Sequence, residues 1–397
     1  MRAQHYKLTD LAGFADDTFV AELDRLREED PVHWHPQADG PGFWVVTRHA
    51  DVSQVYADAE LFSSNRGMRL GGDPVAVRAV ADRMLVVSDP PAHQRVRKLV
   101  GAAFAPRAMR TLEGRVRSVM AELMDTALAA GRCEFVGTVA RPLPTDLVCA
   151  YMGLPKGDWR MVGALTTEGI DSPDEDTRLE ANTELFLYLT RIIEERRRTP
   201  GQDMISDILS AADEAEGEGF SDVDLVMNLV GILIGANETT RYTVAGGLVA
   251  LAEHPQQWRA LRQDQGSLTG TAVDELLRWV APAVHAMRTV TAEAELHGRT
   301  LAAGDRVTVW TSSANRDPRV FERPGEFDLA RTPNRHLSFG HGRHVCVGAR
   351  LARMQIAAFI DELRTRVAAI ELEGTVEWNP SNFTRGPVRV PVRLTAR

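Results

Sequence analysis

One cysteine in a glycine-rich stretch is the feature of this sequence best suited to chemistry. The stretch runs from Phe339 to Gly348 and reads Phe-Gly-His-Gly-Arg-His-Val-Cys-Val-Gly. Apolar residues recur at helical spacing from Val347 onward, which predicts a helix directly after Cys346. A helix dipole and unpaired backbone N–H groups favour a thiolate, so we expect the pKa of Cys346 to be lowered. The glycines let the backbone pass close under a flat ligand.

Two interpretations of Cys346 follow from these residues. The thiolate could be the axial ligand of a haem iron, or the cysteine could be a buried, inert structural residue. Every defined position of Phe-Gly-x-Gly-x-His-x-Cys-x-Gly is filled, and the stretch 339–348 therefore resembles the haem-binding loop of the cytochrome P450 family. That resemblance implies bound haem b, with Cys346 as the ligand of the iron.

A long apolar helix is predicted over residues 221–252, and its middle reads Gly-Ala-Asn-Glu-Thr-Thr. Glu238 and Thr239 would cost stability there unless they are hydrogen-bonded, and a threonine hydroxyl can bond back one turn and open the helix locally. A polar face that reaches solvent is equally consistent with the motif alone. The resemblance implies an oxygen-activating helix, with Glu238 and Thr239 as its catalytic acid–alcohol pair. Ala236 stands where the family often has a second glycine.

Basic residues elsewhere in the chain match positions that hold the cofactor in this family. His93 and Arg97 lie four residues apart in a predicted helix after two prolines, and by themselves they would be a solvated basic edge. The resemblance implies that both residues bind a haem propionate through charge-assisted hydrogen bonds. Arg288 and His344 are expected to do the same, and Phe339 is expected among the cofactor-binding residues.

A Glu-Leu-Leu-Arg motif places Glu275 and Arg278 three residues apart on a predicted helix. Such a pair has little meaning alone, because exposed ion pairs of this kind are common. Its position between the acid–alcohol helix and the cysteine loop matches the family. The resemblance implies a buried network with Arg331 that supports the cysteine side and takes no part in catalysis.

The substrate site is expected around one irregular segment and several apolar positions. Residues 63–87 are rich in glycine and arginine and weakly periodic, which is typical of a binding loop, although a surface excursion is the alternative. Arginines of this segment could meet an acid or lie in water. A histidine such as His285 is more often packed or exposed than a ligand. The expected substrate contacts are Met84, Leu85, Leu233, Ala236, Val284, His285 and Phe383.

Composition limits the remaining possibilities. The chain has 397 residues, a net charge of −9 and three cysteines without CxxC spacing, which argues against general nucleic-acid binding and favours a reducing cytoplasm. The first residues lack the apolar core of a signal peptide, and the apolar run 225–236 is too short for a membrane span. We therefore expect no membrane segment. The resemblance implies one mainly α-helical P450 domain over 1–397, with small β-sheets and haem between two core helices.

The implied activity is that of a haem-thiolate monooxygenase. Electrons would come from a ferredoxin and its reductase, since no Gly-x-Gly-x-x-Gly fingerprint for a flavin or nicotinamide precedes a predicted helix. Arg343, Arg350 and Arg353 could form the docking patch of a monomeric enzyme. The expected substrate is a hydrophobic or aromatic, polyketide-like precursor of a secondary metabolite, free or bound to a carrier protein. Two alternatives are a P450 that couples substrates or uses peroxide without inserting oxygen, and a non-catalytic haem-binding protein.

Overall fold

The computed structural model describes residues 8–15, 18–37, 40–172, 174–214 and 219–397. Its α-helices are α1 (Thr18–Glu29), α2 (His49–Ala57), α3 (Pro74–Val80), α4 (Ala92–Ala103), α5 (Pro106–Ala130), α6 (Pro142–Tyr151), α7 (Trp159–Asp171), α8 (Glu175–Arg198), α9 (Met204–Glu214), α10 (Asp222–Glu253), α11 (Pro255–Gln263), α12 (Thr269–Val280), α13 (Thr311–Ala314) and α14 (Ala349–Arg366). Short helical turns are η1 (Leu11–Phe14), η2 (Leu85–Val87), η3 (Val136–Ala140), η4 (Lys156–Asp158) and η5 (Gly342–His344).

The strands form small sheets, as expected for a mainly helical chain. They are β1 (Val32–His35), β2 (Phe43–Val46), β3 (Phe62–Ser63), β4 (Arg132–Glu134), β5 (His285–Val290), β6 (Ala294–Leu296), β7 (Arg299–Leu301), β8 (Arg306–Trp310), β9 (Val367–Leu372), β10 (Glu377–Trp378), β11 (Pro387–Arg389) and β12 (Pro391–Ala396). The largest described sheet has the order β1-β2-β8-β5-β3, in which β2 and β8 are parallel and the other pairs antiparallel. A second sheet has the order β4-β12-β9.

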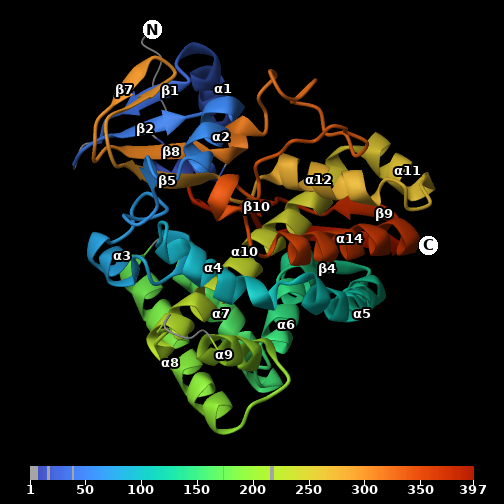
Figure 1. The fold of residues 1–397 in the computed structure, drawn as a ribbon. Helices are drawn as coiled ribbons and strands as arrows, with labels where there is room; N and C mark the ends of the chain where they lie inside the picture. Colours follow the sequence, from blue (N-terminus) through green and yellow to red (C-terminus); the bar gives the residue numbers. More distant parts are fainter. Residues whose placement is uncertain (1–7, 16–17, 38–39, 173, 215–218) are drawn as a thin grey trace.

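Helix α10 runs through the middle of the molecule and contacts α6, α7, α8, α12 and α14 (Figure 1). Its first turn is fixed by a capping box in which Ser221 and Asp224 each accept a hydrogen bond from the other's backbone N–H. Twenty-two of its residues are buried, because helices pack on it from several sides. Close approach to α12 requires a glycine at 247, since a Cβ there would lie 2.5 Å from Leu276 Cδ2.

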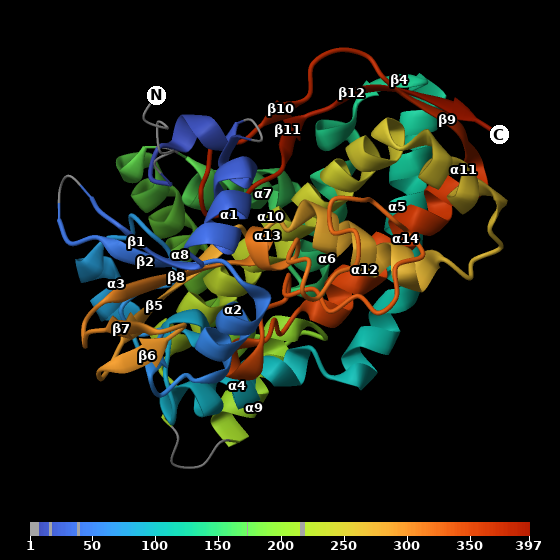
Figure 2. The same cartoon turned by 90° about the horizontal axis from the view of Figure 1, so that it is seen from above.

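Two hydrophobic cores flank α10. One joins α5, α12 and α14 and includes Leu276 and Phe359, and the other joins α4 with α6–α9 and includes Leu185 and Leu233. The five-stranded sheet and the N-terminal helices lie on the side of α10 away from α5 and α14 (Figure 2). Strand β5 thereby brings residues 285–288 to the edge of the helical part. This arrangement places helix, sheet and loop residues around the middle of α10.

The segment 63–87 is more ordered than the expected irregular loop. It contains α3, which begins at Pro74 because the Asp73 carboxylate accepts hydrogen bonds from the N–H groups of Val75 and Ala76. The turn η2 follows and is tied to α10. Helix α3 was not predicted from the sequence, because only the capping residue Asp73 indicates it and the surrounding residues are weakly periodic.

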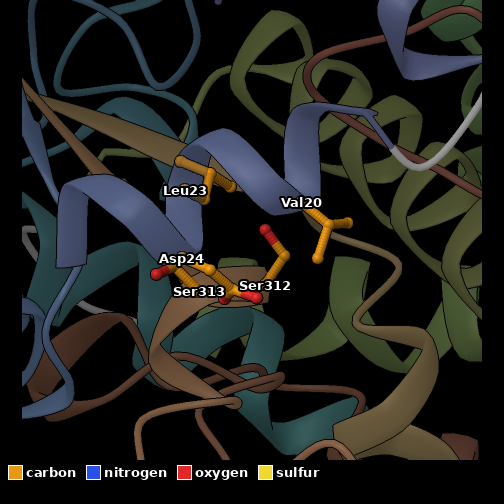
Figure 3. Close-up of a pocket in the computed structure, with 5 residues that line it drawn as sticks. All are labelled: Val20, Leu23, Asp24, Ser312 and Ser313. Atoms are coloured by element: carbon orange, nitrogen blue, oxygen red, sulfur yellow. The ribbon is translucent and has the colours of Figure 1, made fainter. Parts of the chain in front are cut away.

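A narrow crevice lies between α1 and α13, lined by Val20, Leu23, Asp24, Ser312 and Ser313 (Figure 3). Asp24 pairs with Arg27 at 2.7 Å, and Arg27 donates to the hydroxyl of Ser313 at 3.0 Å. Arg27 of α1 is therefore joined to Ser313 of α13 beside this crevice. Among the described residues, none of the helices combines the length and the hydrophobicity that a membrane span requires.

Candidate active site

The loop that carries Cys346 is closed by its own backbone. The N–H of Cys346 donates to the carbonyl of Phe339 at 2.8 Å, and α14 begins three residues later at Ala349, as predicted. Gly342 has φ +69°, and a Cβ there would lie 2.6 Å from the carbonyl oxygen of Tyr56. A side chain at position 342 would therefore push the loop away from α2. The glycines thus fix the path of the chain and with it the position of the sulfur.

The expected direction of the pKa shift at Cys346 was wrong. Burial of the thiol raises its pKa, and the N–H groups of Gly348 and Ala349 and the charge of Arg97 lower it by less. The residue presents accessible surface, but protein atoms enclose the sulfur on its other sides and remove water that would stabilise a thiolate. The helix terminus helps the anion, as predicted, but desolvation is the larger effect.

A group of basic side chains lies beside the cysteine loop. The rings of His93 and His344 have centroids 4.3 Å apart, and Arg97 donates to the carbonyl of Val345 at 2.6 Å. Burial is the first cause that lowers the pKa of both histidines, with His344 lowered to about 3, and the charges of Arg97 and Arg288 add to it. Both imidazoles are therefore neutral at neutral pH, and the two arginines carry the positive charge.

These side chains fit the carboxylates and the iron of haem. His93 is 2% exposed, and neither of its ring nitrogens has a hydrogen-bond partner among the residues that the structure describes. Arg288 is 5% exposed and donates to the carbonyl of Met287 at 2.8 Å. Buried polar groups of this kind need partners, and two propionates next to a cysteine ligand would supply them. The donor set of His93, Arg97, Arg288, His344 and Cys346 therefore suits haem b.

The acid–alcohol pair occupies the middle of α10. The hydroxyl of Thr239 donates to the carbonyl of Gly235 at 3.1 Å, which is the backbone contact one turn earlier that the sequence predicted. Glu238 is 2% exposed and accepts a hydrogen bond from the Thr167 hydroxyl of α7 at 3.0 Å. Its carboxyl group also contacts the guanidinium of Arg241, three residues further along the same helix. The polar face of this part of α10 therefore packs against α7.

Glu238 shares Arg241 with a second carboxylate. Asp171, the last residue of α7, accepts hydrogen bonds from Arg241 at 3.0 Å, from Thr384 at 2.7 Å and from the Tyr242 hydroxyl. Burial raises the pKa of Glu238, the charge of Arg241 opposes this shift and nearby Asp171 adds to it, so that the pKa lies at about 8. One guanidinium cannot compensate two buried carboxylates, so Glu238 holds a proton at neutral pH.

The sequence interpretation assigned no role to two charged residues near Glu238, Arg241 and Asp171. The spacing of Glu238 and Arg241 was a usable signal, because residues three apart on a helix can form an ion pair. No sequence spacing connects either residue to Asp171, which lies 70 positions from Arg241.

Four of the expected substrate residues lie where the segment 63–87 meets α10. Met84 packs on the helix at Gly231, where a Cβ would lie 2.7 Å from the Met84 Cε. The N–H of Leu85 donates to the Asn228 side chain at 2.9 Å. Leu233 is fully buried in the core of α4 and α6–α9, and Ala236 is half-buried against the same core. Substrate contact by these four residues stays a prediction.

The other three expected substrate residues join β5 to the tip between β10 and β11. Val284 donates its N–H to the carbonyl of Phe383 at 2.9 Å, and both side chains are buried. His285 Nδ1 lies 2.6 Å from the Asn382 carbonyl, and its Nε2 accepts the N–H of Leu70 at 3.2 Å. These partners assign a neutral ring protonated at Nδ1, and burial lowers the pKa of His285 to about 4. His285 therefore connects two segments.

The network predicted around Glu275 is confirmed. Glu275 Oε2 accepts hydrogen bonds from Arg278 Nε at 2.7 Å and from Arg331 Nε at 3.1 Å. Glu275 and Arg278 are at most 1% exposed. The segment between α13 and the cysteine loop wraps around these side chains, which agrees with a supporting role.

Comparison with known proteins agrees with this geometry. The family model for cytochrome P450 matches residues 168–365. The chain is 36% identical to cytochrome P450 NovI of Streptomyces niveus, over 93% of this chain and 91% of the relative. It is 34% identical to linalool 8-monooxygenase of Pseudomonas putida, over 94% of this chain and 95% of the relative.

Solved structures with the same fold cover nearly the whole chain. P450 OxyD, which is involved in the biosynthesis of vancomycin-type antibiotics, has a TM-score of 0.89 and 33% identity and covers 99% of this chain and 100% of its own. P450BioI in complex with a hexadec-9Z-enoic acid ligated acyl carrier protein has a TM-score of 0.88 and 26% identity, with 96% and 100% covered. The predicted fold class is therefore confirmed.

Proposed function

Because this chain belongs to the cytochrome P450 family and is therefore a haem-dependent monooxygenase, we propose that it hydroxylates or epoxidises a hydrophobic or aromatic precursor of a secondary metabolite. The observation that carries the proposal is the acid–alcohol pair Glu238–Thr239, which lies in the middle of a buried helix that contacts the helix after Cys346. Relatives such as OxyD, which is involved in the biosynthesis of vancomycin-type antibiotics, support the substrate class.

Different residues of this chain bind the cofactor and deliver protons. Haem bound through a cysteine thiolate would supply oxygen-transfer chemistry, in which one atom of dioxygen enters a C–H or C=C bond and the other leaves as water, with two electrons from the redox partner and two protons. Cys346 would hold the iron, and His93, Arg97, Arg288 and His344 would orient the propionates. Thr239 offers a hydroxyl held by the helix backbone, and protonated Glu238 supplies the proton that the reduced oxygen atom requires.

Replacing Glu238 with glutamine tests the proton-delivery role. A carboxyl group donates only while protonated, and burial raises the pKa of Glu238 to about 8, so its donor form is present below that pH and lost above it. We expect product formation by the wild type to fall as the pH rises through about 8. Glu238→Gln should slow product formation roughly 100-fold and remove this pH dependence. The exposed Glu180 of α8 gives the control variant Glu180→Gln. An unchanged pH profile in Glu238→Gln would contradict the role.

The proposed substrate is either free or tethered to a carrier protein. The complex of P450BioI with a loaded acyl carrier protein supports the tethered form as an option for this fold. The test is a titration of the ferric protein followed by its Soret band, with aromatic and polyketide-like acids offered free and then loaded on a carrier protein. A low- to high-spin shift with free compounds means direct recognition, and a shift only with loaded carrier means protein docking. No shift with either set would refute this substrate class.

The proposed electron donor is a ferredoxin, reduced by its reductase, that docks on a monomer of this cytoplasmic enzyme. Three free cysteines are compatible with a reducing compartment. Arg343 and Arg350 are exposed beside the cysteine loop, whereas Arg353 is engaged by Asp274 at 2.7 Å. A hollow of about 340 Å³ on this face is lined by His93, Gln94, Arg97, Lys98 and Arg343. The rate of reduction by ferredoxin in Arg343→Glu tests the docking, and an unchanged rate would refute it.

A further inference from the structure

Arg69 lies where four separate segments of the chain converge. It belongs to the segment between β3 and α3, and the carbonyl of Met68 on one side of it accepts the N–H of Met287 at 2.8 Å. On its other side the N–H of Leu70 donates to His285 at 3.2 Å. Both neighbours are thus fixed to β5, which leaves the Arg69 side chain little freedom to move away. Its guanidinium is directed toward the last turn of α7 and the tip between β10 and β11.

The guanidinium of Arg69 makes few hydrogen bonds to other groups of the protein. It donates to the carbonyl of Ile170 at 3.3 Å, and its carbon lies 5.6 Å from the centre of the Phe383 ring. Arginine has five N–H donors, and the structure gives Arg69 no ion pair among the described residues. Nearby Asp171 is already occupied by Arg241, Tyr242 and Thr384.

Partial burial and a neighbouring like charge both act on the Arg69 guanidinium. Burial lowers the pKa of Arg69, and the like charge of Arg178 lowers it further, while Asp171 and Glu175 oppose the shift. Arg306 is also partly desolvated, but it donates to acceptors at Gln37, Pro41 and Gly42. A half-buried cation that is under-bonded and repelled by a neighbour favours the approach of an anion.

Arg288 provides a comparison within the same chain. Arg288 is also buried, donates to one backbone carbonyl and has its pKa lowered by burial. The anion expected to bind Arg288 is a haem propionate. Arg69 lies alongside the first residues of β5 and over the ring of Phe383, an expected substrate residue whose carbonyl accepts the N–H of Val284. An anion at Arg69 would therefore belong to the substrate.

We propose that Arg69 binds an anionic group of the substrate, while the hydrophobic body of that substrate extends past Phe383 toward Thr239. This inference rests on the proposed function and defines its substrate as an acid with an apolar body. A carboxylate of a free acid and the phosphate of a phosphopantetheine linker share the chemistry that a guanidinium recognises. Phe383 lies under the guanidinium and would present an apolar face to the carbon atoms next to the anion.

The test compares acids with their uncharged amides. Dodecanoic acid and 4-phenylbutanoic acid, each with its primary amide, are titrated into the ferric holoprotein, and binding is measured by the Soret shift and by equilibrium dialysis. We expect each acid to bind at least about ten-fold more tightly than its amide, as for a hydrogen bond to a charged group. Arg69→Gln should remove that difference by weakening the acid about ten-fold and leaving the amide unchanged. Arg69→Lys, which keeps the charge, should retain part of it.

A control variant and a competition experiment test whether the effect is specific to Arg69 and which anion it binds. Arg66, which is exposed three residues earlier, gives the control Arg66→Gln, for which no change is expected. A carrier protein bearing an unloaded phosphopantetheine arm shows the source of the anion, because it competes with the acids only if its phosphate binds Arg69. Equal affinities for acid and amide, equal weakening of both by Arg69→Gln, or no binding of any acid or of the carrier would overturn the inference. A missing thiolate-type spectrum with carbon monoxide in the wild type would instead refute the proposed function.

Discussion

Cys346→Ser is expected to abolish the thiolate-type spectrum that the ferrous protein gives with carbon monoxide, and with it all measurable turnover. A serine hydroxyl is nearly the same size as the thiol but does not ionise near neutral pH, so the anionic iron ligand is lost. Loss of a group that merely supports a metal ligand costs 10- to 100-fold in affinity or activity, and loss of the ligand itself should exceed about 100-fold. The measurement is the carbon monoxide difference spectrum together with the haem content after purification.

The fold of the Cys346→Ser variant should be unaffected. The loop around position 346 is held by the backbone bond to Phe339 and by the close contact of Gly342 with α2, neither of which involves the sulfur. Cys133, which is half-buried in β4, gives the matched control Cys133→Ser, and it should keep the thiolate spectrum. A thiolate spectrum that survives in Cys346→Ser and is lost in Cys133→Ser would reverse the assignment.

The parts of the site that the sequence predicted are those encoded by neighbouring residues. The cysteine loop, the helix after it and the back-bond of Thr239 each depend on residues within about one or two helical turns, so the local sequence indicated them and the resemblance decided between the interpretations. The Glu275–Arg278 pair is also local. Its partner Arg331 is 53 positions from Arg278, and it was found only because the resemblance supplied the tertiary contact.

The missed features depend on contacts between distant segments. Arg69 and Ile170 are 101 positions apart, and His285 and Leu70 are 215 positions apart. Periodicity carries no information on such pairs. The wrong pKa direction at Cys346 has the same origin, because its thiol is desolvated by packing that no local motif records. Local sequence thus predicted elements such as α14, and with the resemblance it proposed Cys346 as the iron ligand, whereas tertiary packing determined the charges around them.

Glu275→Gln is expected to cause a large loss of folding stability. Arg278 donates to the Glu275 carboxylate at 2.7 and 2.8 Å, and Arg331 donates to it at 3.1 Å. The backbone N–H of Asp328 and the side chain of Asn334 also donate to it, at 2.9 and 3.1 Å. An amide would leave two buried guanidiniums without a negative partner. Breaking a buried pair in this way costs about 3–5 kcal/mol.

That cost is a large fraction of the roughly 5–15 kcal/mol that separates a folded domain from its unfolded state. The measurement is the free energy of unfolding in urea for the holoprotein, with haem retention as a second readout. Glu113→Gln is the matched control, because Glu113 and Arg117 form an ion pair of 3.2 Å on the surface of α5 with side chains 57% and 65% exposed. An exposed pair contributes at most about 1 kcal/mol, so the control should lie close to the wild type. Equal losses in the two variants would show that Arg278 and Arg331 depend on their backbone carbonyl partners and not on the charge of Glu275.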